Sequence, residues 1–320
     1  MVLLQAKKMI SLEQSNNHII KKAELIADLR NIGLKEGDLL HLKVSLKSIG
    51  KIEGGAKTLI EAFLEVLGDK GTIVSDAFVT AHPLPLSKKN STLTDDFTPS
   101  YAGGFANAMI KHPNIYRSKH PIQKFAAIGY LAKELTENHT DKSGGYELLN
   151  EMAKMEAKNL TIGKKVVGVG TTHVAIEHLG FVKKYQNKGV RYKNSSGEVS
   201  IAKMNWHGGC GRGFPNFFDL YDEKGGTIRK GKVGQANALL TDMKKTLEIE
   251  IEKLKIDPTF FFCHRPGCID CRLNWKHSTG NPIVVRYHWL IQNFKEKSIK
   301  GFLLSFWNKV EHFFVKLIKK

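Results

Sequence analysis

The stretch LLHLKVSLKSIGKIEGGAKTLIEAFLEVLGDKGTIVSDAFV, residues 39–79, decides the fold class. It predicts a strand at 39–44, a helix opening after Gly54-Gly55, a turn at 68–71 and a strand at 72–79. The helix is expected because apolar residues recur at steps of three and four, at Leu59, Ile60, Phe63 and Leu67. Strands and helices that alternate in this way favour a layered α/β domain.

The rest of the chain extends the same pattern. Apolar periodicity and turn residues predict helices at 20–33, 105–110, 146–157, 171–178 and 237–256, strands at 124–129, 166–170 and 199–205, and a long loop at 80–101. We therefore predict a three-layer α/β/α sandwich at 1–256. Residues 257–320 are expected to form a small, basic, Cys-containing C-terminal appendage, because they hold three of the four cysteines and an excess of lysine and arginine.

The charge of the chain limits its partners. Lysine and arginine number 49 against 31 aspartates and glutamates, a formal net charge of +18. Such a field attracts anions and disfavours a strongly cationic substrate. No apolar run reaches the roughly 18 residues that span a bilayer, and the apolar opening at residues 1–4 is too short for a signal peptide. The expectation is a cytoplasmic protein.

Several motifs occur in a recognisable order: LRNIGLKEGD at 29–38, SLKSIGKIEGGA at 45–56, RSKHP at 117–121, FAAIG at 125–129, NH at 138–139 and GKVGQA at 231–236. Together they resemble the aminoglycoside 3-N-acetyltransferase family. The resemblance implies an acetyl-CoA-dependent enzyme that acetylates an amine. One departure is that Lys43 and Val44 stand where the family commonly has His and Ser, which implies altered pocket chemistry, a different acyl donor or lost activity.

The segment TTHVAIE, residues 171–177, matches the catalytic segment of that family. The match implies that His173 accepts the proton of the amine and that Glu177 orients His173, since residues four apart share one face of a helix. Ser45 with neighbouring backbone N–H groups would stabilise the thioester oxyanion. The alternative is that His173 and Glu177 are a surface pair at helical spacing.

The resemblance also implies binding residues. A helix that opens at Gly54-Gly55 offers free N–H groups to a phosphate of CoA, although the glycines could serve only to turn the chain. The implied cofactor contacts are Ser45, Lys47, Ser48, Gly54, Gly55, Arg117, Thr171 and Thr172, and the implied substrate contacts are His120 and His207. Arg117 could equally belong to a structural turn.

Three cysteines lie close together in the sequence CHRPGCIDC, residues 263–271. Cys263, Cys268 and Cys271, with His277 or His264 as the fourth ligand, have the composition of a closed structural zinc site. The alternative is three reduced cysteines packed beside the phenylalanines at 260–262. Cys210 stands apart in a glycine-rich loop, where it is interpreted as part of an acceptor-site loop rather than a nucleophile.

The end of the chain suggests a further partner. Residues 299–317 place large apolar side chains at steps of three and four, with lysines around them. Such a helix suits an anionic membrane interface, which would make the protein peripheral at the inner face of the membrane. The same face could instead pack on the catalytic domain or across a homodimer.

The favoured function is transfer of an acetyl group from CoA to a primary amine of an amino sugar, in surface polysaccharide or glycolipid biosynthesis. Acetylation of aminoglycoside antibiotics, and hence antibiotic resistance, is the alternative within the same family. A zinc-containing nucleic-acid-binding module and a non-catalytic scaffold are rivals from other classes. No aromatic-interleaved basic stripe occurs, so no specific nucleic acid is expected.

Overall fold

The computed structural model describes residues 18–90, 92–163 and 168–296. Its strands are β1 (Ile19–Ile20), β2 (Leu39–Val44), β3 (Lys51–Ile52), β4 (Thr72–Asp76), β5 (His82–Pro83), β6 (Leu93–Thr94), β7 (Tyr116–Arg117), β8 (Phe125–Gly129), β9 (Lys158–Gly163), β10 (Lys188–Lys193), β11 (Val199–Lys203), β12 (Thr227–Val233) and β13 (Ala236–Asp242). Its α-helices are α2 (Lys22–Asn31), α3 (Leu46–Ile49), α4 (Ala56–Leu67), α5 (Gly104–Ile110), α6 (Ala132–Glu137), α7 (Glu147–Lys154), α8 (Thr171–His178), α9 (Phe218–Lys224), α10 (Met243–Ile256) and α11 (Pro282–Glu296).

The main sheet has seven strands in the order β12-β13-β9-β2-β4-β8-β7. Its centre is parallel, because β2 pairs in parallel with both β9 and β4. Antiparallel strands extend the sheet on either side. The three parallel strands therefore end at one edge of the sheet, which is where open α/β sheets bind ligands.

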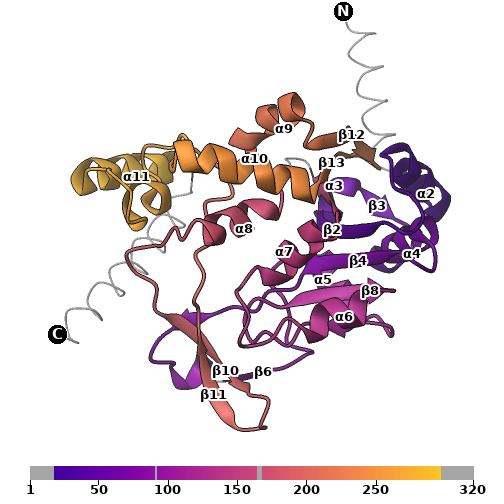
Figure 1. Ribbon diagram of the computed structural model, residues 1–320, viewed down its shortest axis with the longest axis horizontal. Helices are drawn as coiled ribbons and strands as arrows, with labels where there is room; N and C mark the ends of the chain where they lie inside the picture. The colour runs from indigo at the N-terminus through magenta and orange to yellow at the C-terminus, as the bar shows by residue number, and fades with distance from the viewer. Residues whose placement is uncertain (1–17, 91, 164–167, 297–320) are drawn as a thin grey trace, which may run out of the picture.

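Helices cover both faces of this sheet (Figure 1). On one face, buried side chains of α2, α4 and α5 pack on alternate strand residues such as Leu40, Leu42 and Ile73. On the other, α6, α7, α8 and α10 pack on the intervening residues, Leu39 and Val74 among them. The alternation of the strands and the 3.6-residue periodicity of the helices produce the two cores. The predicted three-layer α/β/α sandwich is confirmed.

A smaller sheet lies apart from the main one. β10 pairs with β11 and β5 antiparallel and with β6 in parallel. Figure 1 shows the β10–β11 hairpin projecting away from the helical layers. The segment predicted as a long loop at 80–101 thus supplies two short strands, β5 and β6, to this sheet. Sequence periodicity missed them because two-residue strands carry no period.

Two predicted elements are wrong in position. The helix expected at 237–256 begins at Met243, because residues 236–242 form β13, which pairs with β9 and β12. Asp242 starts the helix by accepting a hydrogen bond from the Lys245 N–H at 2.8 Å. The strand expected at 166–170 is also displaced, since the parallel strand is β9 at Lys158–Gly163; residues 166–167 lie outside the described residues, and 168–170 form no strand.

A third core joins the C-terminal segment to the catalytic layers. It contains Ala175 and Ile176 of α8, Tyr221 of α9, and, from the C-terminal segment, Phe261 and Trp275. The predicted boundary between 256 and 257 therefore runs through shared packing, although the segment is a separate group of elements in sequence. The amphipathic helix predicted at 299–317 lies outside the described residues. None of the described helices is both long enough and apolar enough to span a bilayer.

Candidate active site

A cavity of about 710 Å³ opens at the carboxyl ends of the three parallel strands. β2 contributes Lys43 and Val44, β4 contributes Ser75 and Asp76, and β9 contributes Ile162 and Gly163. The opposite walls come from the loops and helices that follow these strands, with Ser45, Ser48, Phe78, Tyr101, Ala102, Phe105 and Ala106. Apolar walls with a few convergent polar groups are typical of small-molecule sites.

Two serines form the polar wall beside β2. Ser45 immediately precedes α3, and its Oγ lies 2.8 Å from the Oγ of Ser48. The backbone N–H of Ser45 already donates to the carbonyl of Ile162 at 2.8 Å, so this donor is not available to an oxyanion. Among the predicted cofactor contacts, the cavity lining includes Ser45 and Ser48.

A buried polar network connects the parallel strands below the cavity. His41 is fully buried on β2, its Nδ1 lies 2.8 Å from Asn159 Oδ1 and its Nε2 lies 2.9 Å from Asp76 Oδ1. Burial raises the pKa of Asp76, but His41 and Lys43 oppose this with a larger combined effect, so the pKa lies below its usual range. Asp76 is therefore an anion at the floor of the cavity at neutral pH.

His173 lies on the first turn of α8, half-buried between aromatic rings. Its imidazole stacks on Tyr146 with 4.4 Å between ring centroids and meets Phe214 edge-to-face at 4.9 Å. Its Nδ1 is buried and has no hydrogen-bond partner among the described residues. An unpaired buried polar atom is costly, by about 1–3 kcal/mol, so this nitrogen is a place where a bound ligand could supply a partner.

The pKa of His173 is lowered to about 3, mainly by burial and also by the positive charges of Lys43, Lys183 and His41. Asp76 acts in the opposite direction on the same imidazole. Lys43 and Asp76 both line the cavity. His173 is thus neutral at physiological pH, able to accept a proton, and electrostatically coupled to the cavity.

Glu177 does not bond to His173. Its Oε2 accepts a hydrogen bond from the backbone N–H of Tyr146 at 3.3 Å, and the Gly145 N–H also donates to this carboxylate. Its Oε1 lies 2.6 Å from the position that a Cβ on Gly144 would occupy. Glu177 therefore holds the start of α7, where Tyr146 stacks on His173, and reaches the imidazole only through that ring.

We expect Glu177→Gln to lower kcat by less than about tenfold, because the amide oxygen still accepts a hydrogen bond from the 145–146 backbone. Glu177→Ala should lower kcat further and reduce the free energy of unfolding by about 1–3 kcal/mol, since it leaves backbone donors unpaired. Steady-state kinetics and urea unfolding measure the two effects. A Gln variant as inactive as one lacking His173 would show instead that Glu177 takes part in proton transfer.

Comparison with known proteins bears directly on this arrangement. Residues 40–255 match the family model described as aminoglycoside 3-N-acetyltransferase. The chain belongs to this family. The predicted resemblance is confirmed, and the matched residues include both walls of the cavity and the whole of α8.

Individual relatives share part of their length with this member of the family. Aminoglycoside N(3)-acetyltransferase III from Salmonella sp is 33% identical over 162 residues, which is 46% of this chain and 57% of the relative. Aminoglycoside N(3)-acetyltransferase VII from Streptomyces paromomycinus is 27% identical over 172 residues, 49% of this chain and 60% of the relative. The chain thus spans somewhat more than half the length of these relatives.

Solved structures match over more of the chain. The YokD protein from Bacillus subtilis has a TM-score of 0.67 at 21% identity and covers 77% of this chain and 97% of its own. AAC-IIIb, solved as a binary complex with CoASH, has a TM-score of 0.65 at 20% identity and covers 75% of this chain and 97% of its own. At these identities the match establishes the fold.

The two threonines of the family's catalytic segment face away from the cavity. Thr171 Oγ1 lies 3.1 Å from Thr246 Oγ1, and the Thr172 hydroxyl donates to the carboxylate of Glu250 on α10. Burial raises the pKa of Glu250 to about 7, against the hydrogen bonds from Thr172 and Tyr221 that lower it. Predicted as cofactor contacts, both threonines instead fasten the helix that carries His173 to α10.

The remaining predicted cofactor residues are spread out. Arg117 is buried, and its guanidinium donates to the carbonyl oxygens of Asp96, Thr98 and Ala77 at 2.6–2.8 Å. It therefore anchors the loop before α5 and has those donors engaged by protein rather than by phosphate. Lys47 is exposed on α3. Gly54 and Gly55 make the turn into α4 with φ of +71° and +67°, and they are absent from the cavity lining.

The two predicted substrate histidines are held by protein contacts. His120 is buried, stacks on His139 at 4.9 Å, and its Nδ1 accepts hydrogen bonds from the N–H groups of Ile122 and Gln123. His207 is half-buried, and its Nδ1 accepts a hydrogen bond from the Lys183 N–H at 3.2 Å. His207 begins the loop that covers His173, because a Cβ on Gly208 would lie 3.7 Å from His173 Cε1.

The predicted metal-ligand set needs one correction. Cys263, Cys268 and Cys271 do gather, but the fourth member of their group is Cys210, not His277. His277 stacks on Phe262 with 5.3 Å between centroids, so its ring belongs to the aromatic packing. Cys210 is distant in sequence, and the spacing in the C-terminal motif could not point to it.

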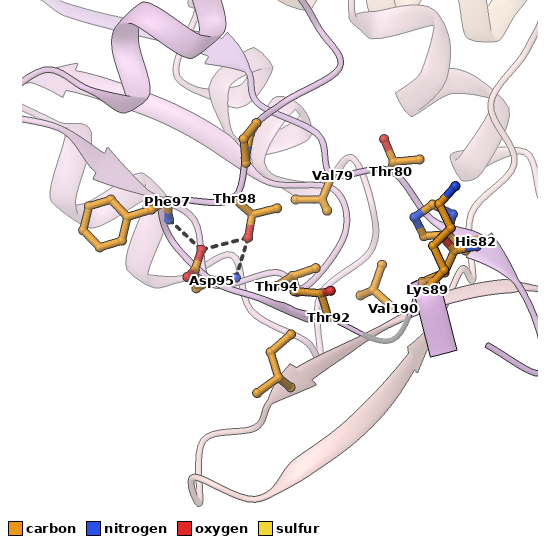
Figure 2. Close-up of a pocket in the computed structure, with 13 residues that line it drawn as sticks. Val79, Thr80, His82, Lys89, Thr92, Thr94, Asp95, Phe97, Thr98 and Val190 are labelled. Atoms are coloured by element: carbon orange, nitrogen blue, oxygen red, sulfur yellow. Dashed lines mark hydrogen bonds between the residues drawn. The ribbon is translucent and has the colours of Figure 1, made fainter. Parts of the chain in front are cut away.

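A second cavity, of about 450 Å³, lies between the loop at 79–99 and β10 (Figure 2). Its one carboxylate, Asp95, is directed at its own loop, where Oδ1 accepts hydrogen bonds from the Phe97 N–H at 2.9 Å and the Thr98 hydroxyl at 2.8 Å. None of the predicted site residues lines this cavity. The chemistry therefore concentrates at the strand ends and not here.

Sequence reasoning missed His41, Asp76 and Tyr146. The signal for the first two was present: His41 is the one histidine in the apolar run LLHLKV, and Asp76 ends the run TIVSD at the carboxyl end of a predicted strand. A polar residue in a buried strand needs a partner, and parallel strand ends meet. Tyr146 carried no such signal, because its contact with His173 depends on how α7 and α8 pack.

Proposed function

We propose that this protein transfers an acetyl group from acetyl-CoA to a primary amine. The observation that carries the proposal is a neutral, half-buried His173 that is electrostatically coupled to Asp76 and Lys43 in the wall of a 710 Å³ cavity. Family membership supports the same reaction, and AAC-IIIb, which shares the fold, was solved with CoASH. The proposal places the CoA thioester in the cavity beside Ser45 and Ser48.

The proposed mechanism is direct transfer in a ternary complex. The amine nitrogen attacks the thioester carbonyl carbon, the carbon–sulfur bond breaks, and His173 takes the proton that the amine loses. The CoA thiolate leaves and is then protonated. Ser45 Oγ donates to the oxyanion that forms on the carbonyl oxygen. Glu177 acts at one remove, because it holds the backbone of Tyr146, whose ring supports the imidazole.

For the acceptor we propose an anionic amino sugar, such as one linked to a nucleotide. Lys43 and Lys183 both act on His173, and the chain carries a formal net charge of +18. Such a site repels a polycation and attracts a phosphate-bearing sugar. Aminoglycosides are the second candidate, because the relatives carry that name and a related AAC(3)-IVa variant was solved with a gentamicin at 24% identity.

Calorimetry with acetyl-CoA, followed by an acceptor panel that reads release of free thiol, tests the function. We expect acetyl-CoA to bind below millimolar concentration and a nucleotide-linked amino sugar to be acetylated with a higher kcat/KM than gentamicin. The preference should narrow as salt is added, because salt screens the field of the protein. Absence of acetyl-CoA binding at millimolar concentration would refute the transferase proposal, and a preference for gentamicin would refute only the proposed acceptor.

A membrane-proximal location at the inner face of the membrane is a further proposal, and it rests on the sequence at 299–317 alone. It would bring the site near a lipid-linked amino sugar. Co-sedimentation of the full chain with anionic vesicles tests it, with binding expected to weaken as salt is added. A homodimer across the same helix is the alternative, and sedimentation analysis would detect it.

A further inference from the structure

The four cysteines of the chain come together in space although they are far apart in sequence. Cys210 lies in the loop between β11 and α9, while Cys263, Cys268 and Cys271 lie in the C-terminal segment. Their Sγ atoms all lie within 4.8 Å of one another. Two of the separations are 3.8 Å, between Cys263 and Cys271, and 3.9 Å, between Cys210 and Cys268.

These separations match one kind of site. Zinc bound by four thiolates has Zn–S bonds of about 2.3 Å in a tetrahedron. The edge of a tetrahedron is about 1.6 times the distance from its centre to a corner, so neighbouring sulfurs are about 3.8 Å apart. A disulfide requires about 2.05 Å between sulfurs. The observed separations of 3.8 and 3.9 Å therefore fit a shared ion and not two disulfides.

The surroundings also suit a bound ion. Cys263 and Cys271 are buried and Cys210 and Cys268 half-buried, beside Phe261 and Trp275, which exclude water. The Cys263 N–H donates to Cys271 Sγ at 3.4 Å, a contact that favours a thiolate. Arg272 is held nearby by its hydrogen bond to the Cys263 carbonyl at 2.7 Å, and its charge offsets part of the net negative charge of a four-thiolate zinc centre.

We propose that Cys210, Cys263, Cys268 and Cys271 bind one zinc ion as thiolates, each releasing its thiol proton to solvent. With four protein ligands the site is closed, so its role is structural. The ion would clasp the loop at 207–213 to the C-terminal segment. That loop is already in close contact with this segment, because a Cβ on Gly213 would lie 2.0 Å from the carbonyl oxygen of Phe261.

The clasp is adjacent to the active site. Gly208, two residues before Cys210, packs on His173, and Phe214, four residues after Cys210, meets the same imidazole edge-to-face. The ion would therefore fix the cover over His173 without contacting the acetyl-CoA cavity, whose lining contains no residue of this loop. The expected effect on acceptor binding rests on the proposed function, whereas the metal site does not.

The first experiment measures the metal itself. Full-length protein purified under reducing conditions without chelator should contain about one zinc per chain, and X-ray absorption should give four sulfurs at about 2.3 Å and no nitrogen at about 2.0 Å. His264→Ala removes an exposed histidine of the same motif and is the matched control that should keep the zinc. Protein that holds no zinc and takes up none overturns the proposal, as does iron in its place or a pair of disulfides found by mass spectrometry.

The second experiment separates the clasp from the ion's other three ligands. Cys210→Ser should lower zinc affinity by at least tenfold, whereas His277→Gln should leave it unchanged, because the His277 ring packs on Phe262. Cys210→Ser should raise KM for the acceptor while acetyl-CoA affinity by calorimetry stays within about twofold. If Cys210→Ser fails to fold, the sulfur count from X-ray absorption on the wild-type protein decides. A count of three sulfurs and one nitrogen would overturn the assignment of Cys210.

Discussion

Replacing His173 with alanine should lower kcat by about 10²–10⁴-fold while leaving the affinity for acetyl-CoA nearly unchanged. The loss follows from removal of the group that accepts the amine proton, which contributes on the order of 10²–10⁴ in general base catalysis. Acetyl-CoA affinity should persist because the cavity lining does not include His173. Steady-state kinetics with the best acceptor of the panel, together with calorimetry, measure both quantities.

His178→Ala is the matched control, because His178 lies on the same helix and is exposed. Its kcat should stay within about twofold of the wild type. Near-normal turnover of His173→Ala would remove the imidazole from the mechanism, and a parallel loss of acetyl-CoA affinity would show that the substitution had disturbed the cavity rather than the proton transfer.

The second large effect is on stability in acid. Burial lowers the pKa of His120 to about 3, with further contributions from His139 and Lys124. In the unfolded chain a histidine has a pKa of about 6.5. As the pH falls below 6.5, the unfolded state binds a proton that the native state refuses until about pH 3, so stability is lost over that window. Between pH 7 and pH 5 this one group should remove about 2 kcal/mol.

His120→Asn isolates the effect, because an asparagine oxygen can accept the hydrogen bonds that the Ile122 and Gln123 N–H groups donate to Nδ1. Urea unfolding of the wild type should show a fall in free energy between pH 7 and pH 5 that exceeds the fall in the variant by about 2 kcal/mol. The difference is needed because Glu250, with its pKa raised to about 7, titrates with the opposite sign. Parallel curves for the two proteins would contradict a neutral His120.

The sequence was informative wherever a signal was local. The strands at 39–44 and 72–76 and the helix between them were predicted because their apolar periods and glycine turns lie within a few residues. The strand at 236–242 was missed, because ANALLTD is also compatible with a helix and its pairing with β9 joins residues about 80 apart. Such pairing is a property of the folded sheet rather than of the window.

The site divides in the same way. The motif at 171–177 pointed to His173, but the partner of Glu177 could not be predicted, because helical spacing places two residues on one face without fixing which groups they meet. Thr171 and Thr172 were assigned to the cofactor although they face α10. Cys210 was separated from the other cysteines by more than fifty residues, and only folding brings it beside them.

The burial of His41 between Asn159 and Asp76 has a consequence for how the chain selects one strand alignment. In the parallel centre, His41 lies opposite Asn159 on β9 and Val74 on β4, and Asp76 is two residues further along β4. Sliding β2 by a single residue would turn the imidazole to the opposite face, among the aliphatic side chains of α2 and α4. It would then be buried without partners, as would the carboxylate it left behind. The apolar residues of β2 tolerate either alignment, so this polar residue discriminates against the misaligned sheet.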